Sequence, residues 1–148
     1  MAKFYICTSL KRKKEHNIVR DILVEGGHEI THDWSKIPDL DVLWKRERKI
    51  SCLQEQNKAV ADSDFVVVLL PGGRGTHCGL GVASYLEKPT FIHAYEDWDM
   101  ENSLFYWHGG ARHLMRMPIY TFAHQICHIL EIEEKSRIRK VGEIQPSL

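Results

Sequence analysis

The chain has 148 residues, enough for one domain with a substantial hydrophobic core, and 43% of them are hydrophobic and 27% charged, as is typical of soluble globular proteins. Twenty basic residues balance twenty acidic residues, so no net charge favours nucleic acid or an anionic membrane as a partner. No apolar stretch reaches the roughly 18 residues that a membrane span needs, and the N-terminus does not resemble a signal peptide, so we expect a cytoplasmic protein.

Strand-like and helix-like segments alternate along the chain. Short apolar runs predict five strands, at residues 3–7, 29–32, 65–70, 89–93 and 118–122. Segments with helical periodicity predict four helices, at residues 11–25, 41–61, 76–87 and 123–139. The remaining long segment, residues 94–117, is rich in aromatic residues without clear periodicity, and we expect a long loop or a partial helix there.

This alternation predicts a three-layer α/β fold, a flavodoxin-like or Rossmann-like parallel sheet of about five strands with helices on both faces. We expect a single domain over residues 1–140 and a C-terminal tail over 141–148. In the flavodoxin-like strand order, ligands bind at the carboxyl edge between the first and third strands. The loops at residues 7–10 and 71–79 should therefore converge there, although they are sixty residues apart.

Residues 64–81 carry the most informative pattern in the chain. An apolar run that suits a strand covered on both faces is followed by five glycines within ten residues. Such glycines let the backbone approach a ligand, and the amides of the next helix can meet an anion or a sugar. A tight turn without a ligand remains the alternative. A P-loop is excluded because no lysine follows the glycines, and a dinucleotide fingerprint has Cys78 in place of its third glycine. We therefore predict no cofactor.

Three segments together resemble a known family: Lys3-Phe-Tyr-Ile-Cys-Thr-Ser9, Thr31-His-Asp-Trp34, and the stretch from Ala61 to Ala83. They resemble the nucleoside 2-deoxyribosyltransferase-like superfamily, which includes deoxynucleoside monophosphate N-glycosidases. The resemblance runs from residue 3 to about residue 93, and a weaker similarity is present at residues 103–108. It implies a nucleoside or nucleotide as the small-molecule substrate, transfer or hydrolysis of the base–sugar bond, and a homo-oligomer, dimer or larger.

The family pattern G-[ST]-x-x-E-L-G supplies a catalytic glutamate, and here that position is Gly79. A carboxylate stabilises the oxocarbenium-like transition state or forms a covalent intermediate, and glycine can do neither. Losing one such partner typically costs about 3 kcal/mol or more of transition-state stabilisation. Cys78 is adjacent, but on a helix it points about 100° away. Asp33 follows the second strand and is the best remaining carboxylate, with a turn or cap role as its alternative.

The remaining candidates are binding residues. Thr8 and Ser9 could hydrogen-bond a ribose or a phosphate, or else cap the next helix. Arg74 could bind a phosphate bidentately. Trp34 and Tyr106 could stack on a base, or pack at a subunit contact. The glycine loop itself supplies the last three predicted substrate-binding positions, which are Gly73, Gly75 and Thr76.

Metal and disulfide chemistry are not expected. His124 and His128 are four residues apart on a predicted helix, but no third ligand is positioned by the sequence. The four cysteines are dispersed without a CxxC pair, which indicates reduced thiols.

Two functions follow from these residues. The first is a nucleoside-binding or nucleotide-binding protein of this family whose cleavage activity is impaired by Gly79, and the second is a non-catalytic nucleotide-binding or sensing module. A third interpretation is that Gly79 is an engineered or sporadic replacement in an otherwise active protein.

Overall fold

The apolar run after Asp64 forms the central strand β3 (Phe65–Leu69), in which every residue is buried. Strand β1 (Lys3–Cys7) pairs with it on one side and β4 (Thr90–His93) on the other, both in parallel. A strand with two hydrogen-bonded neighbours and a helix layer on each face meets no water, which is why its sequence does not alternate between apolar and polar residues.

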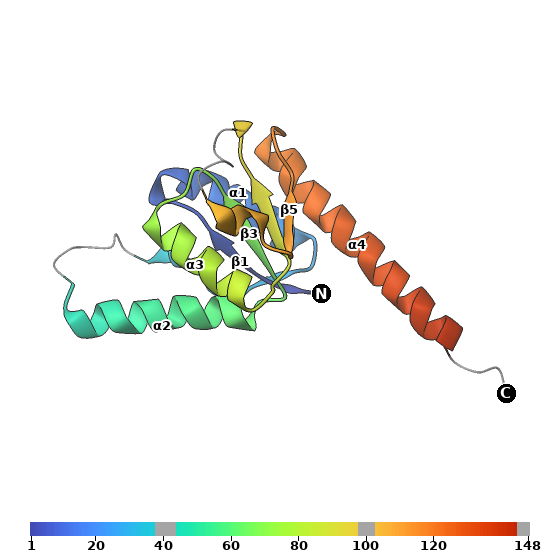
Figure 1. Cartoon of the computed structure of the whole chain (residues 1–148), viewed down its shortest axis with the longest axis horizontal. Coiled ribbons are helices and arrows are strands. Elements are labelled where there is room, and N and C mark those ends of the chain that lie inside the picture. Colours follow the sequence, from blue (N-terminus) through green and yellow to red (C-terminus); the bar gives the residue numbers. More distant parts are fainter. Residues whose placement is uncertain (38–43, 98–102, 145–148) are drawn as a thin grey trace.

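The computed structural model describes residues 1–37, 44–97 and 103–144. Two short strands complete the sheet, β2 (Glu29–Ile30) beside β1 and β5 (Ala111–His113) beside β4. The strand order is β2-β1-β3-β4-β5 and every pairing is parallel. This is the predicted flavodoxin-like order, and it confirms the predicted fold class (Figure 1).

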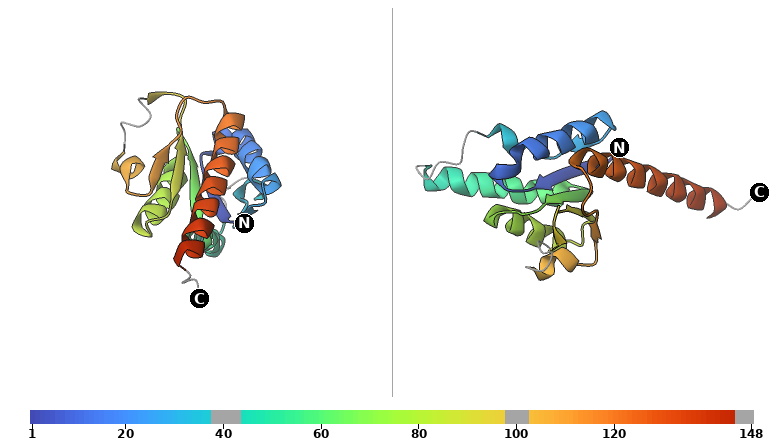
Figure 2. Two further views of the ribbon diagram at one scale, coloured as in Figure 1. Left: turned by 90° about the vertical axis from the view of Figure 1, so that its right-hand side faces the viewer. Right: turned by 90° about the horizontal axis from the view of Figure 1, so that it is seen from above.

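Helices cover both faces of the sheet (Figures 1 and 2). On one face, α1 (Lys13–Glu25) and α4 (Ile119–Ile144) pack against the even-numbered side chains of β1 and odd-numbered side chains of β3, with Phe4 and Phe65 at the centre. On the other face, α2 (Arg46–Asp62) and α3 (Arg74–Tyr85) cover the alternate residues of the same strands. Each face therefore has its own hydrophobic core, since successive strand residues point to opposite sides.

The predicted fifth strand was wrong. Residues 118–122 are not a strand: Ile119 opens α4, and the amide of Phe122 donates to the carbonyl of Pro118 at 3.0 Å. Helical periodicity begins there, because apolar residues at positions 119, 122, 123 and 126 share one buried face. The fifth strand is β5, a strand of three residues that lies within the segment that we expected to be a long loop or a partial helix.

The other elements begin and end close to their predicted positions. A 3-10 turn, η1 (Leu10–Arg12), precedes α1, and another, η2 (Trp34–Lys36), follows β2. The predicted loop over 94–117 also contains η4 (Leu104–Trp107). Residues 41–43 of the predicted second helix lie outside the described residues. None of the helices that the structure describes is long and apolar enough to cross a membrane, and all four cysteines, each of them described, are free thiols.

Candidate functional site

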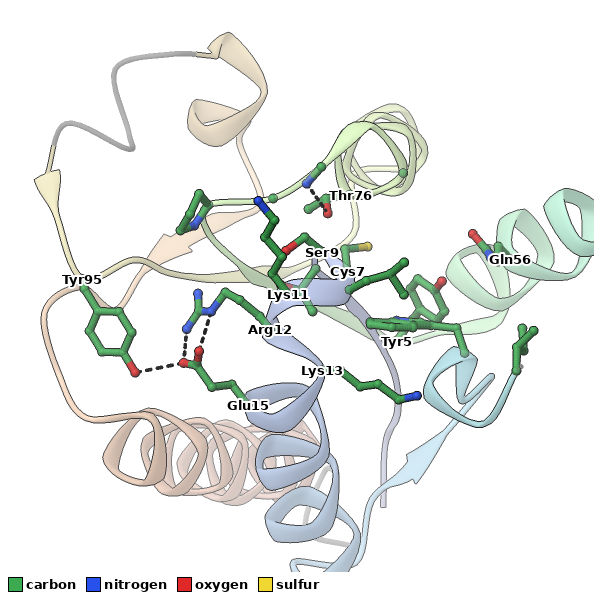
Figure 3. A pocket seen from close by; sticks show the side chains of 18 residues that line it. Tyr5, Cys7, Ser9, Lys11, Arg12, Lys13, Glu15, Gln56, Thr76 and Tyr95 are labelled. Atoms are coloured by element: carbon green, nitrogen blue, oxygen red, sulfur yellow. Dashed lines mark hydrogen bonds and ion pairs between the residues drawn. The ribbon is translucent and has the colours of Figure 1, made fainter. Parts of the chain in front are cut away.

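A cavity of about 760 Å³ opens at the carboxyl ends of β1 and β3, as predicted for this fold (Figure 3). Its volume lies within the range of small-molecule sites. The cavity is lined by segments that follow β1 and β3 and by parts of η2, α2 and the segment after β4. The lining residues are Tyr5, Cys7, Thr8, Ser9, Leu10, Lys11, Arg12, Lys13, Glu15, Trp34, Ile37, Gln56, Pro71, Gly72, Gly73, Gly75, Thr76 and Tyr95.

Hydrogen bonds join the two loops that the sequence predicted to converge. The hydroxyl of Thr8 donates to the carbonyl of Leu69 at 2.8 Å, and Nη1 of Arg12 donates to the carbonyl of Leu70 at 2.5 Å. A Cβ atom added at Gly73 would lie 3.9 Å from Cβ of Ser9. The end of β3 is therefore tied directly to the start of α1, and the loops form one wall.

The glycine loop leads directly into the amino end of α3, where Gly73 is the N-cap residue. The amide of Gly73 donates to the hydroxyl of the buried Thr76 at 3.1 Å. Gly72 must lack a side chain, because a Cβ there would lie 2.4 Å from Cγ2 of Thr76. At Gly75, in contrast, a Cβ would meet nothing within 4 Å. The amides of the first helical turn have no acceptor within the helix, so this end of the cavity suits an anion.

Arg12, Glu15 and Tyr95 form a hydrogen-bonded group at one end of the cavity (Figure 3). Nε of Arg12 donates to Oε1 of Glu15 at 2.9 Å, Nη2 of Arg12 pairs with Oε2, and the hydroxyl of Tyr95 donates to Oε2 at 2.9 Å. The hydrogen bond from Arg12 is the main reason that the pKa of Glu15 is lowered. Glu15 is therefore an ionised carboxylate at neutral pH.

The opposite end of the cavity is aromatic. Tyr5 is buried on β1, and Figure 3 shows it with Gln56 of α2, away from Arg12 and Tyr95. Nε1 of Trp34 donates to the carbonyl of Ile6 at 2.8 Å, which fixes the indole at this wall. Burial raises the pKa of Tyr5, and it raises the pKa of Cys7 to about 12. The thiol of Cys7 is therefore protonated at neutral pH and unsuited to act as a nucleophile.

Gly79 does not line the cavity; it faces β1. A Cβ atom there would lie 2.7 Å from Sγ of Cys7, 3.9 Å from its Cβ and 4.0 Å from Cε1 of Tyr5. The cysteine side chain thus fills the space into which a side chain at position 79 would extend. The absence of a side chain at Gly79 and the presence of a thiol at Cys7 are parts of one packing arrangement.

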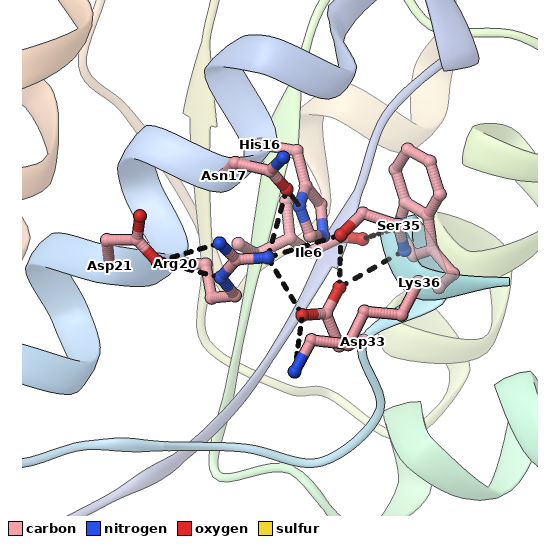
Figure 4. A network of polar contacts seen from close by, with 9 residues as sticks. Ile6, His16, Asn17, Arg20, Asp21, Asp33, Ser35 and Lys36 are labelled. Atoms are coloured by element: carbon pink, nitrogen blue, oxygen red, sulfur yellow. Dashed lines mark hydrogen bonds and ion pairs between the residues drawn. The ribbon is translucent and has the colours of Figure 1, made fainter.

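Asp33 is placed away from the cavity, in a polar network between α1 and η2 (Figure 4). It is the N-cap residue of η2 and accepts from the amide of Ser35 at 3.1 Å. Nη1 of Arg20 donates to its other oxygen at 2.9 Å. Burial acts to raise the pKa of Asp33, but the hydrogen bonds from Ser35 and Arg20 hold it below its usual value. The capping alternative therefore accounts for this residue.

Six of the predicted substrate-binding residues line the cavity, and two do not. The six are Thr8, Ser9, Trp34, Gly73, Gly75 and Thr76. Arg74 is exposed on α3 and is not part of the lining. Tyr106 is buried beyond α3, with its hydroxyl 2.5 Å from Nε2 of His77. The roles assigned to the six residues stay predictions.

Sequence reasoning did not find Glu15, Tyr95 or Gln56. The three-residue spacing of Arg12 and Glu15 was a signal, since it suits an ion pair on one helical turn. Tyr95 is eighty residues from Glu15 and had no such signal. Within the residues that the structure describes, no group of three or more His, Cys, Asp or Glu side chains could hold a metal ion, and His124 and His128 are exposed.

The same three-layer α/β fold occurs in solved structures of an N-glycosidase and a 2-deoxyribosyltransferase. The CMP N-glycosidase BcmB of Clostridium botulinum superposes with a TM-score of 0.56 and 14% sequence identity, covering 84% of this chain and 97% of that chain. A 2-deoxyribosyltransferase from the psychrotolerant Bacillus psychrosaccharolyticus gives a TM-score of 0.51 and 16% identity, covering 65% of this chain and 74% of that one. At these identities the likeness establishes the fold and leaves the activity open.

A third structural neighbour has a different function. DNA processing protein A of Helicobacter pylori, described with a single-stranded DNA binding mode, gives a TM-score of 0.53 and 17% identity, covering 84% of this chain and 80% of that chain. The fold therefore gives no support to our prediction that nucleic acid is not a partner. No protein-family model matches the sequence, and no curated protein matches it significantly.

Proposed function

We propose that this protein belongs to the nucleoside 2-deoxyribosyltransferase-like superfamily and binds a nucleoside or nucleotide in the cavity, with cleavage of the base–sugar bond slow or absent. The observation that carries the proposal is the combination, in one cavity, of an aromatic wall and the amino ends of two helical segments. A base can stack on the first, and a sugar or phosphate can meet the second.

The charges near the amino ends of the helices support this orientation. Lys11, Arg12 and the acidic Glu15 belong to the lining there, whereas the side chain of Lys13 extends toward the side of Tyr5 (Figure 3). The positive ends of the helix dipoles at η1–α1 and at α3 add to the same potential. A ligand whose phosphate or hydroxyl-rich sugar lies near the amino ends of α1 and α3, and whose flat base lies against Tyr5 and Trp34, would match both the positive potential and the aromatic wall.

The packing at Gly79 is the reason for expecting little turnover. In the family pattern a glutamate at this position faces the bond that breaks, whereas here the protonated thiol of Cys7 occupies that space. A neutral thiol neither stabilises the positive charge of the transition state nor attacks the sugar efficiently. The site keeps groups that bind and lacks the group that cleaves, which also fits a sensing module.

A ligand panel with two matched variants tests the proposal. Nucleosides and 5′-monophosphates are added, melting temperature and dissociation constant are measured, and free base is assayed. A ligand at 100 times its dissociation constant should stabilise the protein by about 2.7 kcal/mol. The Gly75→Val variant, whose side chain enters open space beside the cavity, should weaken binding by about tenfold or more.

The matched control is Gly81→Val on the same helix, where an added Cβ also meets nothing within 4 Å and which lies outside the cavity lining. It should bind like the wild type. No stabilisation by any member of the panel, or equal binding by both variants, would contradict a nucleotide site here. Rapid release of base by the wild-type protein would contradict the expected slow turnover.

Slow hydrolysis is a second candidate function, favoured by one observation. Glu15 is the only carboxylate among the described residues that line the cavity, and it is ionised. It could stabilise an oxocarbenium-like state, although its ion pair with Arg12 already offsets part of its charge. Glu15→Gln should then lower residual base release by roughly 100-fold with a similar dissociation constant. The exposed Glu96→Gln serves as the control, and unchanged release in Glu15→Gln would exclude this role.

A further inference from the structure

The amino-terminal half of α2 projects beyond α1 and α3, on the side of the molecule where those two helices begin (Figures 1 and 2). The buried residues of α2, Ala59 and Val60, lie near its carboxyl end. From residue 45 to residue 54 every side chain is exposed except the half-buried Cys52. Gln56, which lines the cavity, lies between these two parts. The projecting half of α2 therefore begins at the wall of the cavity and continues outward from it.

The side of this projecting half that continues from Gln56 is basic. Four residues, which we call the basic track, carry the charge: Lys45, Arg46, Arg48 and Lys49. At about 100° per residue, Lys49 lies within about 20° of Gln56 around the helix, and the two arginines lie about 80° to either side. Glu47, the only acidic residue between positions 45 and 54, lies on the opposite side of the helix. The track is therefore an extension of the cavity wall with a positive charge.

Positive charge also lines the cavity itself. Lys11 and Lys13 belong to the lining, and both side chains are exposed. The side chain of Lys13 extends toward the side of the cavity on which Tyr5 and Gln56 lie (Figure 3). Glu15, the acidic residue of the lining, is already engaged in an ion pair. An anion that leaves the cavity on this side therefore passes from Lys13 to the basic track.

An aromatic side chain lies at the outer end of the basic track. The guanidinium carbon of Arg48 lies 4.1 Å from the ring centre of Trp44, which is half-buried. A base can stack on such a ring or on the plane of the guanidinium, while the positive charge meets a phosphate. Basic side chains combined with stacking surfaces are typical of proteins that bind single-stranded nucleic acid.

We propose that the cavity takes the terminal nucleotide of a single-stranded nucleic acid, and that the phosphates of the following nucleotides lie along the basic track. This inference rests on the proposed function, because it needs a nucleotide in the cavity. A free nucleotide ends close to the cavity, whereas Arg46 is ten residues from Gln56, which is about 15 Å along the helix. A polymer with one phosphate for each nucleotide reaches both places.

The balance of basic and acidic residues over the whole chain led us to expect no nucleic acid partner. The structure separates these charges in space. The acidic residues Glu131, Glu133 and Glu134 lie on α4, which extends from the opposite end of the molecule to the basic track (Figure 1). A net charge of zero therefore leaves a positive surface at the cavity. A single strand suits the cavity better than a duplex, because the last base of a duplex is already paired and stacked.

The first test measures dissociation constants for a 5′-mononucleotide, a nucleoside triphosphate and single-stranded deoxyoligonucleotides of increasing length, at several salt concentrations. The longer strands should bind at least about tenfold more tightly than the mononucleotide, and the mononucleotide should displace them. Their log affinity should fall more steeply with log salt, by about 0.7 for each additional phosphate contact.

The outcomes separate this inference from the proposed function. Strands that bind no more tightly than the mononucleotide, or no more tightly than the triphosphate, would refute the inference and leave the nucleotide site intact. A duplex of the same sequence that binds as tightly as the strand would also refute it. A protein that binds none of these ligands would refute the inference and the proposed function together.

The second test uses matched pairs of substitutions. Arg46→Gln with Lys49→Gln should weaken the long strands about tenfold more than the mononucleotide, and should reduce their salt slope by about 0.7 for each charge removed. Arg139→Gln with Lys140→Gln removes the same charge from exposed positions of α4 and should bind strands like the wild type. Gly75→Val should weaken strands and mononucleotide alike. Equal losses in the two double variants, or strands that are insensitive to Gly75→Val, would overturn the proposal.

Discussion

Gly79 and Cys7 belong to a single packing unit, and this decides whether a side chain at position 79 can be accommodated. A Cβ at position 79 would come within 2.7 Å of the thiol, closer than carbon and sulfur atoms pack. A glutamate introduced at position 79 therefore cannot be accommodated by itself, because Cys7 must first move or become smaller. The two positions have to be changed together.

A double-mutant cycle tests this coupling at the scale of single residues. Gly79→Ala gains about 1 kcal/mol of helix propensity but overpacks against Cys7. In the background of Cys7→Ala the added methyl group has room. We expect the effect of Gly79→Ala on the free energy of unfolding to be more favourable by about 1–3 kcal/mol in that background. Denaturant unfolding measures all four proteins, and additive effects would show that the two side chains do not compete.

The sequence predicted the place of the cavity better than the charged groups that line it. Strand and loop patterns placed Ser9 and Gly73 at one edge, because parallel strands end together. The position of Asp33 after a strand suggested a catalytic role, but its carboxylate is engaged by Ser35 and Arg20. Glu15 was not found, since its orientation into the cavity depends on contacts with Tyr95 that no local pattern encodes.

At the scale of elements, Arg12 links α1 to the loop that precedes α3. Its bond to the carbonyl of Leu70 is buried, and its removal leaves that carbonyl without its donor. Arg12→Met should lower the free energy of unfolding by about 1–3 kcal/mol and accelerate amide exchange at Gly72 and Gly73. Lys11→Met, an exposed neighbour, is the control for exchange. Equal exchange in the two variants would show that the loop holds its shape without Arg12.

The elements that were predicted well are those with long apolar patterns. Strand β3 and helix α1 were placed almost correctly, since each has a repeated period that packing reinforces. Strand β5 has the sequence Ala-Arg-His and pairs on one side only, so neither its composition nor its length distinguishes it from a loop. The β-branched and aromatic residues that open α4 suggested a strand, and packing against the core overrode that local preference.

At the scale of the whole molecule, stability should depend on pH through two buried histidines. His16 and His93 are fully buried, and burial lowers the pKa of each below its ordinary value of 6.5. The unfolded chain then binds more protons than the folded protein below pH 6.5, so the free energy of unfolding falls as pH decreases. Each histidine can account for at most about 1.4 kcal/mol of the decrease in unfolding free energy between pH 7.5 and pH 5.5.

Denaturant unfolding at the two pH values measures this loss. His16→Gln and His93→Gln should each reduce the difference in unfolding free energy between pH 7.5 and 5.5. The exposed His124→Gln should leave that difference unchanged. Glu15 does not interfere in this window, because its pKa is lowered from 4.5 and its contribution is lost only at more acidic pH. A pH difference that is the same in all four proteins would contradict the role of the buried histidines.

The hydrogen bonds from Thr8 and Arg12 to the end of β3 affect the order in which parts of the protein fold. They join positions 58 and 61 residues apart, so the walls of the cavity meet only after β1 and β3 have paired across the intervening chain. During refolding, recognition of ligand should arise together with this pairing and later than the formation of α1, whose backbone hydrogen bonds are local. A nucleotide present in the refolding mixture would then slow unfolding far more than it speeds folding.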